Sequence, residues 1–312
     1  MSTDAAIQTA GLTKIFGRQR AVDELDLTVP RGSVFGFLGP NGSGKTTTIR
    51  MLLGLAGASS GEIRMLGEAM PASLGSVLPR VGALVEGPAI YPFLSGRANL
   101  LRLDSADPHA PSATRRARVD AALDRVGLSH AAGKKAHAYS LGMKQRLGIA
   151  NALLRPRELL ILDEPSNGLD PQGTREVRAL IRSLSADGTT VFVSSHLLSE
   201  IEQLCSHLAV MSAGRLVAHG TLAELSRGKV RVTVRTPDAA AAARVLSELR
   251  LPLEASSAGD TVSAMLVDGV LPETVTAALV AADVRVRGLT VAGETLEERF
   301  VALTGEGFDV AG

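Results

Sequence analysis

The sequence predicts an α/β protein. Its larger domain should combine a β-rich start with an inserted helical segment, and a small α+β domain should follow at the C-terminal end. Three observations support this prediction. A glycine-rich stretch at 39–46 stands between a strand-like run and a helix-like run. The continuous apolar run at 159–162 is typical of a strand buried in a parallel sheet. At about 226–229 the pattern changes, and residues 230–235 alternate strictly between apolar and polar.

Composition narrows the class of protein. The chain has 312 residues, 45% of them hydrophobic, which is enough to build one large or two smaller cores. Lys and Arg number 33 against 32 Asp and Glu, so we expect no nucleic-acid partner. The one cysteine, Cys205, excludes an intramolecular disulfide and favours a reducing compartment. With no apolar run of ~18 residues and no signal-like start, we expect neither a membrane span nor secretion.

The glycine-rich stretch carries the strongest local signal. It reads Gly39-Pro40-Asn41-Gly42-Ser43-Gly44-Lys45-Thr46 and fits the pattern G-x-x-x-x-G-K-[ST] of a phosphate-binding P-loop. Glycines let backbone N–H groups turn onto phosphate oxygens, and the following helix N-terminus adds partial positive charge. Lys45 would reach the β- and γ-phosphates, and the Thr46 hydroxyl would ligate Mg²⁺.

The rest of the larger domain is predicted element by element from periodicity. A helical insertion at about 88–155 includes an arginine-rich helix at 112–126, whose arginines we interpret as a solvated face. Strands are expected at 7–16, 21–29, 33–38, 61–66, 80–85, 159–162, 189–194, 208–211 and 215–218, and helices at 47–53, 147–154, 171–185 and 197–205.

The C-terminal domain, 226–312, alternates strands and helices. We expect strands at 230–235, 261–267 and 284–291, helices at 238–250, 272–282 and 295–304, and an extra strand near 251–257. This order fits a small ferredoxin-like domain. It contains no catalytic constellation, so the predicted chemistry belongs to residues 1–225.

Two carboxylates, Asp163 and Glu164, directly follow the apolar run at 159–162. Asp163 is placed to hold Mg²⁺, and Glu164 is the candidate base for an attacking water. The alternative is that they only form a turn. His196 follows the next predicted strand, and parallel strands direct their C-terminal ends toward one crevice. His196 is therefore a candidate γ-phosphate contact, the alternative being a surface or helix-capping histidine.

A second anion site is predicted just ahead of the carboxylates. Ser140 stands at an N-cap position, and Gly142 leaves backbone N–H groups accessible. Asn167-Gly168-Leu169-Asp170 follows the carboxylate pair.

Together these motifs resemble the ATP-binding subunit of an ABC transporter over residues ~5–225. Walker A corresponds to 39–46, Walker B to 159–164 and the signature to 139–146; the D-loop lies near Asp170 and the switch histidine is His196. The resemblance implies catalytic roles for Glu164 and His196, and Mg²⁺ ligation by Thr46, Asp163 and Glu86. It implies nucleotide contacts from Phe16, Val22, Gly39, Pro40, Asn41, Gly42, Ser43, Gly44, Lys45, Thr46, Thr47, Glu86, Ser140, Gly142 and Asp170. Phe16 matches the aromatic residue that stacks on adenine in this family, and the alternative is that it is a core phenylalanine. For Glu86 the alternative is that its side chain points to solvent and has no role.

Two departures from the family pattern point to one branch. The signature reads Tyr139-Ser140-Leu141-Gly142-Met143 where Leu-Ser-Gly-Gly-Gln is common, and Glu86 stands where the family usually has Gln. Both features, with the ending at 295–305, resemble the drug and peptide-antibiotic exporters of the bacitracin- and daunorubicin-resistance type.

The resemblance implies a subunit that binds ATP and Mg²⁺, dimerises as a homodimer or heterodimer, and energises a separate membrane permease from the cytoplasmic side. Rival readings are a soluble ABC ATPase acting on ribosomes or nucleic acid, and a non-hydrolytic nucleotide sensor. The apolar segment 87–94, with Tyr91 and Phe93, is a candidate permease-docking surface. The alternative is that both aromatics fill the core of the insertion.

Overall fold

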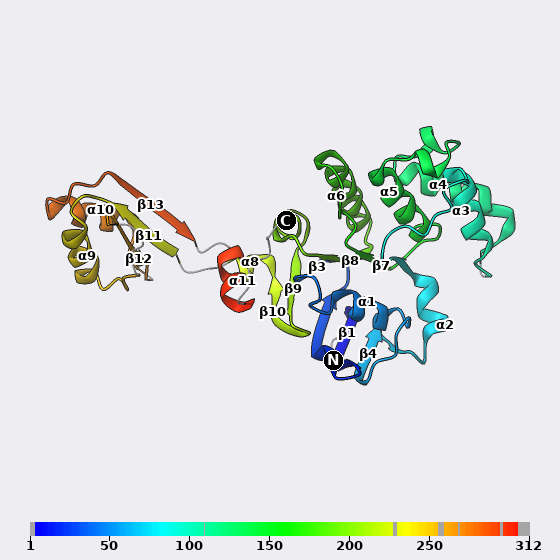
Figure 1. Cartoon of the computed structure of the whole chain (residues 1–312), viewed down its shortest axis with the longest axis horizontal. Helices are drawn as coiled ribbons and strands as arrows, with labels where there is room; N and C mark the ends of the chain where they lie inside the picture. The colour runs from blue at the N-terminus through cyan, green and yellow to red at the C-terminus, as the bar shows by residue number, and fades with distance from the viewer. Residues whose placement is uncertain are drawn as a thin grey trace. The chain divides into compact units, whose positions relative to one another are not determined.

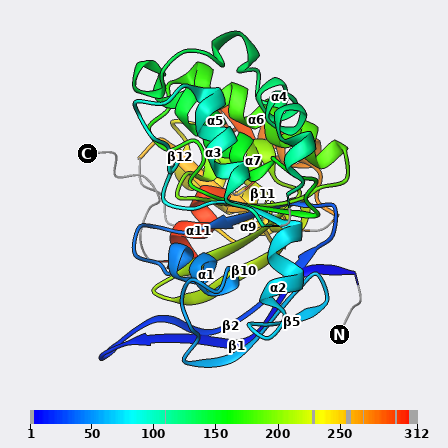
Figure 2. The same cartoon turned by 90° about the vertical axis from the view of Figure 1, so that its right-hand side faces the viewer.

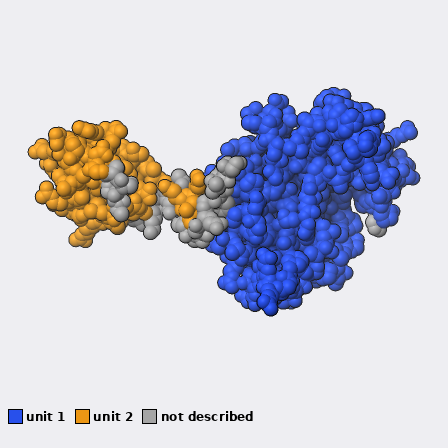
Figure 3. Space-filling view, viewed as in Figure 1, with its two compact units in different colours: residues 1–222, 308–312 blue, residues 223–307 orange. Residues whose placement is uncertain are grey.

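The computed structural model describes residues 4–108, 110–226, 230–254, 259–267, 269–293 and 296–304. They form two compact units that divide between Leu222 and Ala223 (Figure 3). The sequence placed this division a few residues later, at 225–226.

Unit 1 contains two sheets. An antiparallel sheet, in the order β2-β1-β4-β5, is formed by β1 (Ala5–Phe16), β2 (Gln19–Pro30), β4 (Ser60–Met65) and β5 (Glu68–Met70). A six-stranded sheet, in the order β10-β9-β3-β8-β7-β6, is formed by β3 (Val34–Leu38), β6 (Val81–Leu84), β7 (Leu159–Asp163), β8 (Thr190–Ser195), β9 (His207–Ser212) and β10 (Arg215–Thr221). All of its neighbouring strands are parallel except β9 and β10. The predicted strands of this unit are therefore present, with small shifts at their ends.

Helices cover the six-stranded sheet. On one side lies α1 (Lys45–Leu52), next to the antiparallel sheet; on the other lie α3 (Gly96–Ser105), α4 (Arg115–Arg125), α5 (Leu141–Ala152) and α6 (Pro171–Ala186), as Figures 1 and 2 show. The shorter helices of this unit are α2 (Leu74–Val77) and α7 (Leu198–Leu204), and α8 (Leu222–Leu225) begins at the boundary with unit 2.

Two helix predictions need correction. The helix expected at 147–154 begins at Leu141, because Ser140 caps it by accepting a hydrogen bond from the Met143 N–H at 3.2 Å. The arginines of α4 do not form only a solvated face. Arg115 and Arg118 both bind the buried Asp104, so this part of the helix is held by ion pairs to α3.

The main core of unit 1 fills the space between the two sheets and α1. Phe192 of β8 stacks on Phe35 of β3 with a centroid distance of 5.8 Å, and it meets Phe37 at 5.2 Å. Aromatic residues make up only 3% of the chain, and apart from these three phenylalanines the core consists of aliphatic side chains and methionines. This rigid core fixes the strand ends that carry the site.

Unit 2 contains a three-stranded antiparallel sheet in the order β12-β11-β13, made of β11 (Val230–Arg235), β12 (Thr261–Met265) and β13 (Gly288–Gly293). The helices α9 (Ala239–Glu248), α10 (Pro272–Ala281) and α11 (Leu296–Thr304) alternate with these strands. The predicted alternation of strands and helices is present, and β11 lies between the other two strands; the ferredoxin-like fold stays a prediction. The extra strand expected near 251–257 is reduced to one bridge, Leu253 to Ala264, while residues 255–258 lie outside the described part.

Among the described helices, none combines the length and apolar character that crossing a lipid bilayer requires.

Candidate active site

The glycine loop connects β3 to α1, as the sequence predicted. Gly44 has φ 103°, and a Cβ at this position would lie 2.4 Å from the Ala21 carbonyl oxygen and 3.3 Å from a methyl group of Val22. Only glycine therefore allows the loop to lie against β2. Val22 is fully buried, which makes it a support for the loop from behind.

Lys45 is buried within this loop. Its Nζ donates hydrogen bonds to the carbonyl oxygens of Gly39 at 2.5 Å and Pro40 at 3.2 Å, and lies 3.4 Å from Glu164 Oε1. Burial lowers the pKa of the Lys45 ammonium, and the Glu164 carboxylate opposes that shift. An anion bound at the loop would stabilise the charged ammonium of Lys45 as the Glu164 carboxylate does.

Ser43 is a second sign that the loop is built for an anion. Its Oγ is buried and has no hydrogen-bond partner among the described residues. Buried hydroxyls are normally satisfied, so this donor fits a phosphate oxygen bound at the loop. The loop residues of this chain thus fit a nucleoside triphosphate.

Asp163 connects the loop to the end of β7. Its Oδ2 accepts a hydrogen bond from Thr46 Oγ1 at 3.0 Å, and its Oδ1 accepts one from Ser194 Oγ at 2.5 Å. A hydroxyl and a carboxylate oxygen side by side, next to a phosphate-binding loop, are ligands that suit Mg²⁺. Mg²⁺ keeps several waters and substrate oxygens, so it needs few protein ligands. Consistently, the described residues contain no cluster of three or more acidic, histidine or cysteine side chains of metal-binding geometry.

Glu164 follows Asp163 with φ 48°, a left-handed conformation that is uncommon outside glycine. Its Oε2 lies 2.8 Å from Nδ1 of His196, and its backbone N–H donates to Ser194 Oγ at 2.9 Å. The carboxylate is only partly buried, so a water molecule can reach it. Glu164 and His196 are therefore paired, as a base and its orienting partner would be.

Ser194 is the residue that sequence reasoning missed. It is fully buried, and its hydroxyl contacts the side chain of Asp163 and the backbone of Glu164 at once. The pairing of the two strands is the signal that would have identified it. β7 and β8 are adjacent and parallel, and Asp163 lies opposite Ser194 in their register.

Two predicted contacts lie at the edge of this site. Phe16 is 52% exposed, with Lys14 Nζ 4.9 Å from its ring centroid, so the alternative of a core phenylalanine is wrong. Glu86 forms an ion pair with Arg50 of α1, and within the described residues it makes no hydrogen bond with Thr46 or Asp163. Metal ligation by Glu86 stays a prediction.

The signature and D-loop residues form a separate surface. Ser140 caps α5, and Asp170 caps α6 by accepting a hydrogen bond from the Gly173 N–H at 2.8 Å. A Cβ at Gly142 would meet Gly173 Cα at 3.7 Å, so the two helix N-termini lie side by side. Within the described part of the chain, Ser140, Gly142 and Asp170 have no hydrogen bond or ion pair with the glycine loop. Residues from a second copy would be needed to combine these two surfaces.

Fold and site together define a P-loop ATPase: a glycine loop between β3 and α1, and a carboxylate pair at the end of β7. Comparison with known proteins agrees. The family model for the ABC transporter matches residues 22–167. The chain is 49% identical over 213 residues to the bacitracin transport ATP-binding protein BcrA of Bacillus licheniformis, covering 68% of each chain. It is 37% identical to the daunorubicin/doxorubicin resistance ATP-binding protein DrrA of Streptomyces peucetius, covering 97% of this chain and 94% of that one.

A solved structure gives the same answer. CbiO1 of Clostridium perfringens, part of the ABC transporter complex cbiONQ, superimposes with a TM-score of 0.65 at 28% identity, over 71% of this chain and 90% of that one. The chain therefore belongs to the ATP-binding subunits of ABC transporters. It is an ATP-binding protein and an ATP hydrolase of that family, whose members work with permease partners.

Proposed function

We propose that this chain energises the export of an antibiotic or a drug, in the manner that the names of BcrA and DrrA indicate for those proteins. The observation that carries the ATPase part is the assembly of Lys45, Asp163, Glu164 and His196 around one glycine loop. The choice of exporter rests on the relatives, because fold alone does not select a transported compound.

Hydrolysis would use the residues of unit 1 in distinct roles. The loop N–H groups and Lys45 would bind the β- and γ-phosphates, and Phe16 would stack on the adenine. Thr46 and Asp163, with Glu86 as a further candidate, would hold Mg²⁺, which supplies charge neutralisation on the phosphates when bound. Glu164 would take the proton of the attacking water, and His196 would orient Glu164 and contact the γ-phosphate.

A dimer would complete the nucleotide site. The surface of Ser140, Gly142 and Asp170 would meet the γ-phosphate of ATP held by the opposite protomer, because two helix N-termini direct N–H groups outward there. We assign ATP binding to residues 1–225 and an accessory role to 226–312.

The permease would dock near segment 87–94 on the cytoplasmic side of the cell membrane. Tyr91 is 46% exposed and Phe93 is 80% exposed, so the alternative that they fill the core of the insertion is wrong. Beside them, a cavity of about 120 Å³ is lined by residues that include Pro88, Ile90 and Leu103. Exposed aromatics beside an apolar hollow suit the insertion of a partner helix.

The test is to purify the chain with its copurifying membrane protein and to measure ATP hydrolysis and drug resistance in cells that carry wild type or Glu164→Gln. We expect resistance to bacitracin- or anthracycline-class compounds with wild type only. Turnover stimulated by ribosomes or nucleic acid, without a membrane partner, would favour the soluble ATPase. Equal resistance with both versions would favour the non-hydrolytic sensor.

A further inference from the structure

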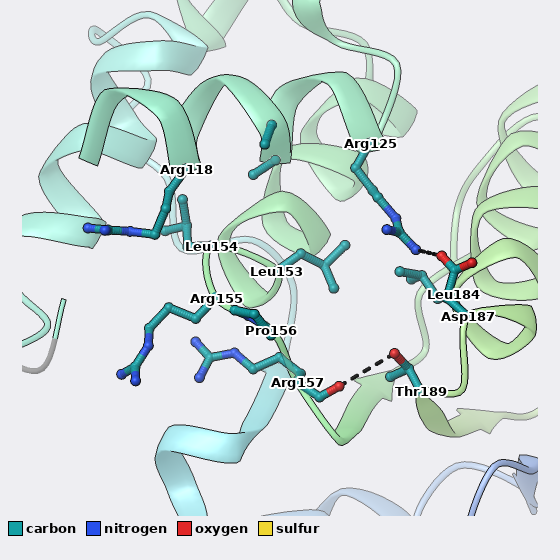
Figure 4. A pocket seen from close by; sticks show the side chains of 12 residues that line it. Arg118, Arg125, Leu153, Leu154, Arg155, Pro156, Arg157, Leu184, Asp187 and Thr189 are labelled. Carbon is teal, nitrogen blue, oxygen red and sulfur yellow. Dashed lines mark hydrogen bonds and ion pairs between the residues drawn. The ribbon is translucent and has the colours of Figure 1, made fainter. Parts of the chain in front are cut away.

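A cavity of about 450 Å³ lies in unit 1 away from the glycine loop, between the helical insertion and the catalytic core (Figure 4). Its walls come from α4, from the segment that joins α5 to β7, and from the end of α6 with the loop into β8. The lining residues are Arg118, Ala121, Ala122, Arg125, Leu153, Leu154, Arg155, Pro156, Arg157, Leu184, Asp187 and Thr189. Its volume falls within the ~300–1,000 Å³ that small-molecule sites usually have.

The lining is strongly basic. Four of its side chains are arginines, and Asp187 is its one carboxylate. Asp187 is already paired with Arg125, an ion pair that Figure 4 shows. Arg118 and Arg155 are paired with Asp104 and Asp107, which do not line the cavity. The cavity is thus lined by positive charge, and the carboxylates that pair with Arg118 and Arg155 lie outside its lining.

Arg157 is the least balanced of these arginines. Its Nε donates to the Ala152 carbonyl oxygen at 2.9 Å and its Nη1 to the Pro79 carbonyl oxygen at 2.5 Å, and no carboxylate of the described chain forms an ion pair with it. Burial, and then the positive charge of Arg155, lower the pKa of the Arg157 guanidinium. Partly buried charges are normally paired, so an anion between Arg155 and Arg157 would stabilise this arrangement.

Aliphatic side chains line the same cavity. They are Ala121 and Ala122 of α4, Leu153 and Leu154, and Leu184 of α6. A site that combines guanidinium groups with aliphatic side chains suits a ligand that has both an anionic group and an apolar part.

We propose that this cavity binds an amphiphilic anion, with a phosphate group on Arg155 and Arg157 and an alkyl body against the aliphatic side chains. Such a ligand would touch α4 of the insertion together with α6 and the start of β8, so it would connect the insertion to the core. The ligand could be the headgroup end of an anionic lipid or a free alkyl phosphate, which share this chemistry.

The experiment uses the full chain saturated with ADP, which fills the glycine loop, and titrates octyl phosphate below its micelle concentration by calorimetry. We expect saturable binding of one molecule per chain. The double change Arg155→Gln with Arg157→Gln should weaken it about tenfold or more, since two charge-assisted hydrogen bonds are lost. The matched control is Arg116→Gln, because Arg116 is an exposed arginine of α4 that does not line the cavity.

A second variant guards against misfolding of the double change. Ala121→Trp fills the cavity from its exposed rim and removes no charge, and it should also abolish binding. Three outcomes would overturn the proposal. They are an equal loss of octyl phosphate affinity in Arg116→Gln, binding of uncharged octyl glucoside as tight as that of octyl phosphate, and retained octyl phosphate binding in Ala121→Trp. Co-flotation with phosphatidylglycerol vesicles that is lost in Ala121→Trp would identify the lipid as the source. Octyl phosphate binding without co-flotation would identify a free amphiphile.

Discussion

Ser194→Ala should damage both the stability and the turnover of this ATPase. The hydroxyl of Ser194 donates to Asp163 Oδ1 at 2.5 Å and accepts from the Glu164 N–H at 2.9 Å. Alanine removes both bonds and leaves the buried carboxylate oxygen and the Glu164 amide without this partner. It also removes a hydroxyl that contacts both acidic residues of the site.

The size of the effect follows from the two bonds. A hydrogen bond to a charged group contributes ~1.5–3 kcal/mol and a neutral one ~0.5–1.5 kcal/mol. We therefore expect the free energy of unfolding to fall by about 2–4 kcal/mol. Because a displacement of about 1 Å in a catalytic group can cost ~100-fold, we expect turnover at saturating Mg²⁺-ATP to fall by about 10- to 100-fold.

The neighbouring Ser195 offers a matched control. It is also buried; its hydroxyl accepts from the Leu197 N–H at 3.0 Å and donates to Glu200 Oε2 at 3.2 Å. Ser195→Ala therefore loses the same two kinds of bond without touching Asp163 or Glu164. Urea unfolding and phosphate release would be measured on both variants. If the two are equally destabilised and turn over ATP at the same rate, the positioning role of Ser194 is refuted.

Four further variants test the site and its partners. Lys45→Ala should weaken ATP binding and stop turnover, whereas Glu164→Gln should keep ATP bound and lower turnover by ~10² or more; hydrolysis by Glu164→Gln at the parent rate would remove Glu164 from catalysis. Gly142→Asp, placed in the Glu164→Gln background, should abolish the ATP-dependent dimer in size-exclusion chromatography while monomers still bind ATP, because a Cβ there meets nothing closer than 3.7 Å within its own chain. An intact dimer would contradict the proposed contact. The double variant Tyr91→Ala with Phe93→Ala should no longer bind the permease, while its melting temperature stays unchanged because both rings are exposed. Retained permease binding would place the docking surface elsewhere.

Much of the larger unit was predictable because local signals agreed with the fold. The glycine loop and the apolar run before Asp163 each specify an element and its end. The register between strands was not readable, so the pairing of Asp163 with Ser194 was missed. The ion pair of Arg50 with Glu86 joins residues 36 apart and depends on tertiary packing.

The smaller unit shows where periodicity is a weaker guide. The strand expected at 284–291 begins only at Gly288, because the chain first makes a tight turn in which the Val286 N–H donates to the Val284 carbonyl oxygen at 2.9 Å. The start of α5 was predicted too late. Gly142 lowers helix propensity, so the first turn of the helix looked like a loop in the sequence. In both cases a tight turn or a cap overrode the local pattern.

The contact of Lys45 with Glu164 has a consequence for the order of events in a catalytic cycle. One ammonium serves two anions, the carboxylate of the proposed base and the phosphates of the substrate, so these two compete for it. An arriving triphosphate would attract Lys45 to its own oxygens and so release the Glu164 carboxylate from this contact. Nucleotide binding would in this way free the Glu164 carboxylate to contact a water molecule, whereas a chain without nucleotide would hold that carboxylate on Lys45.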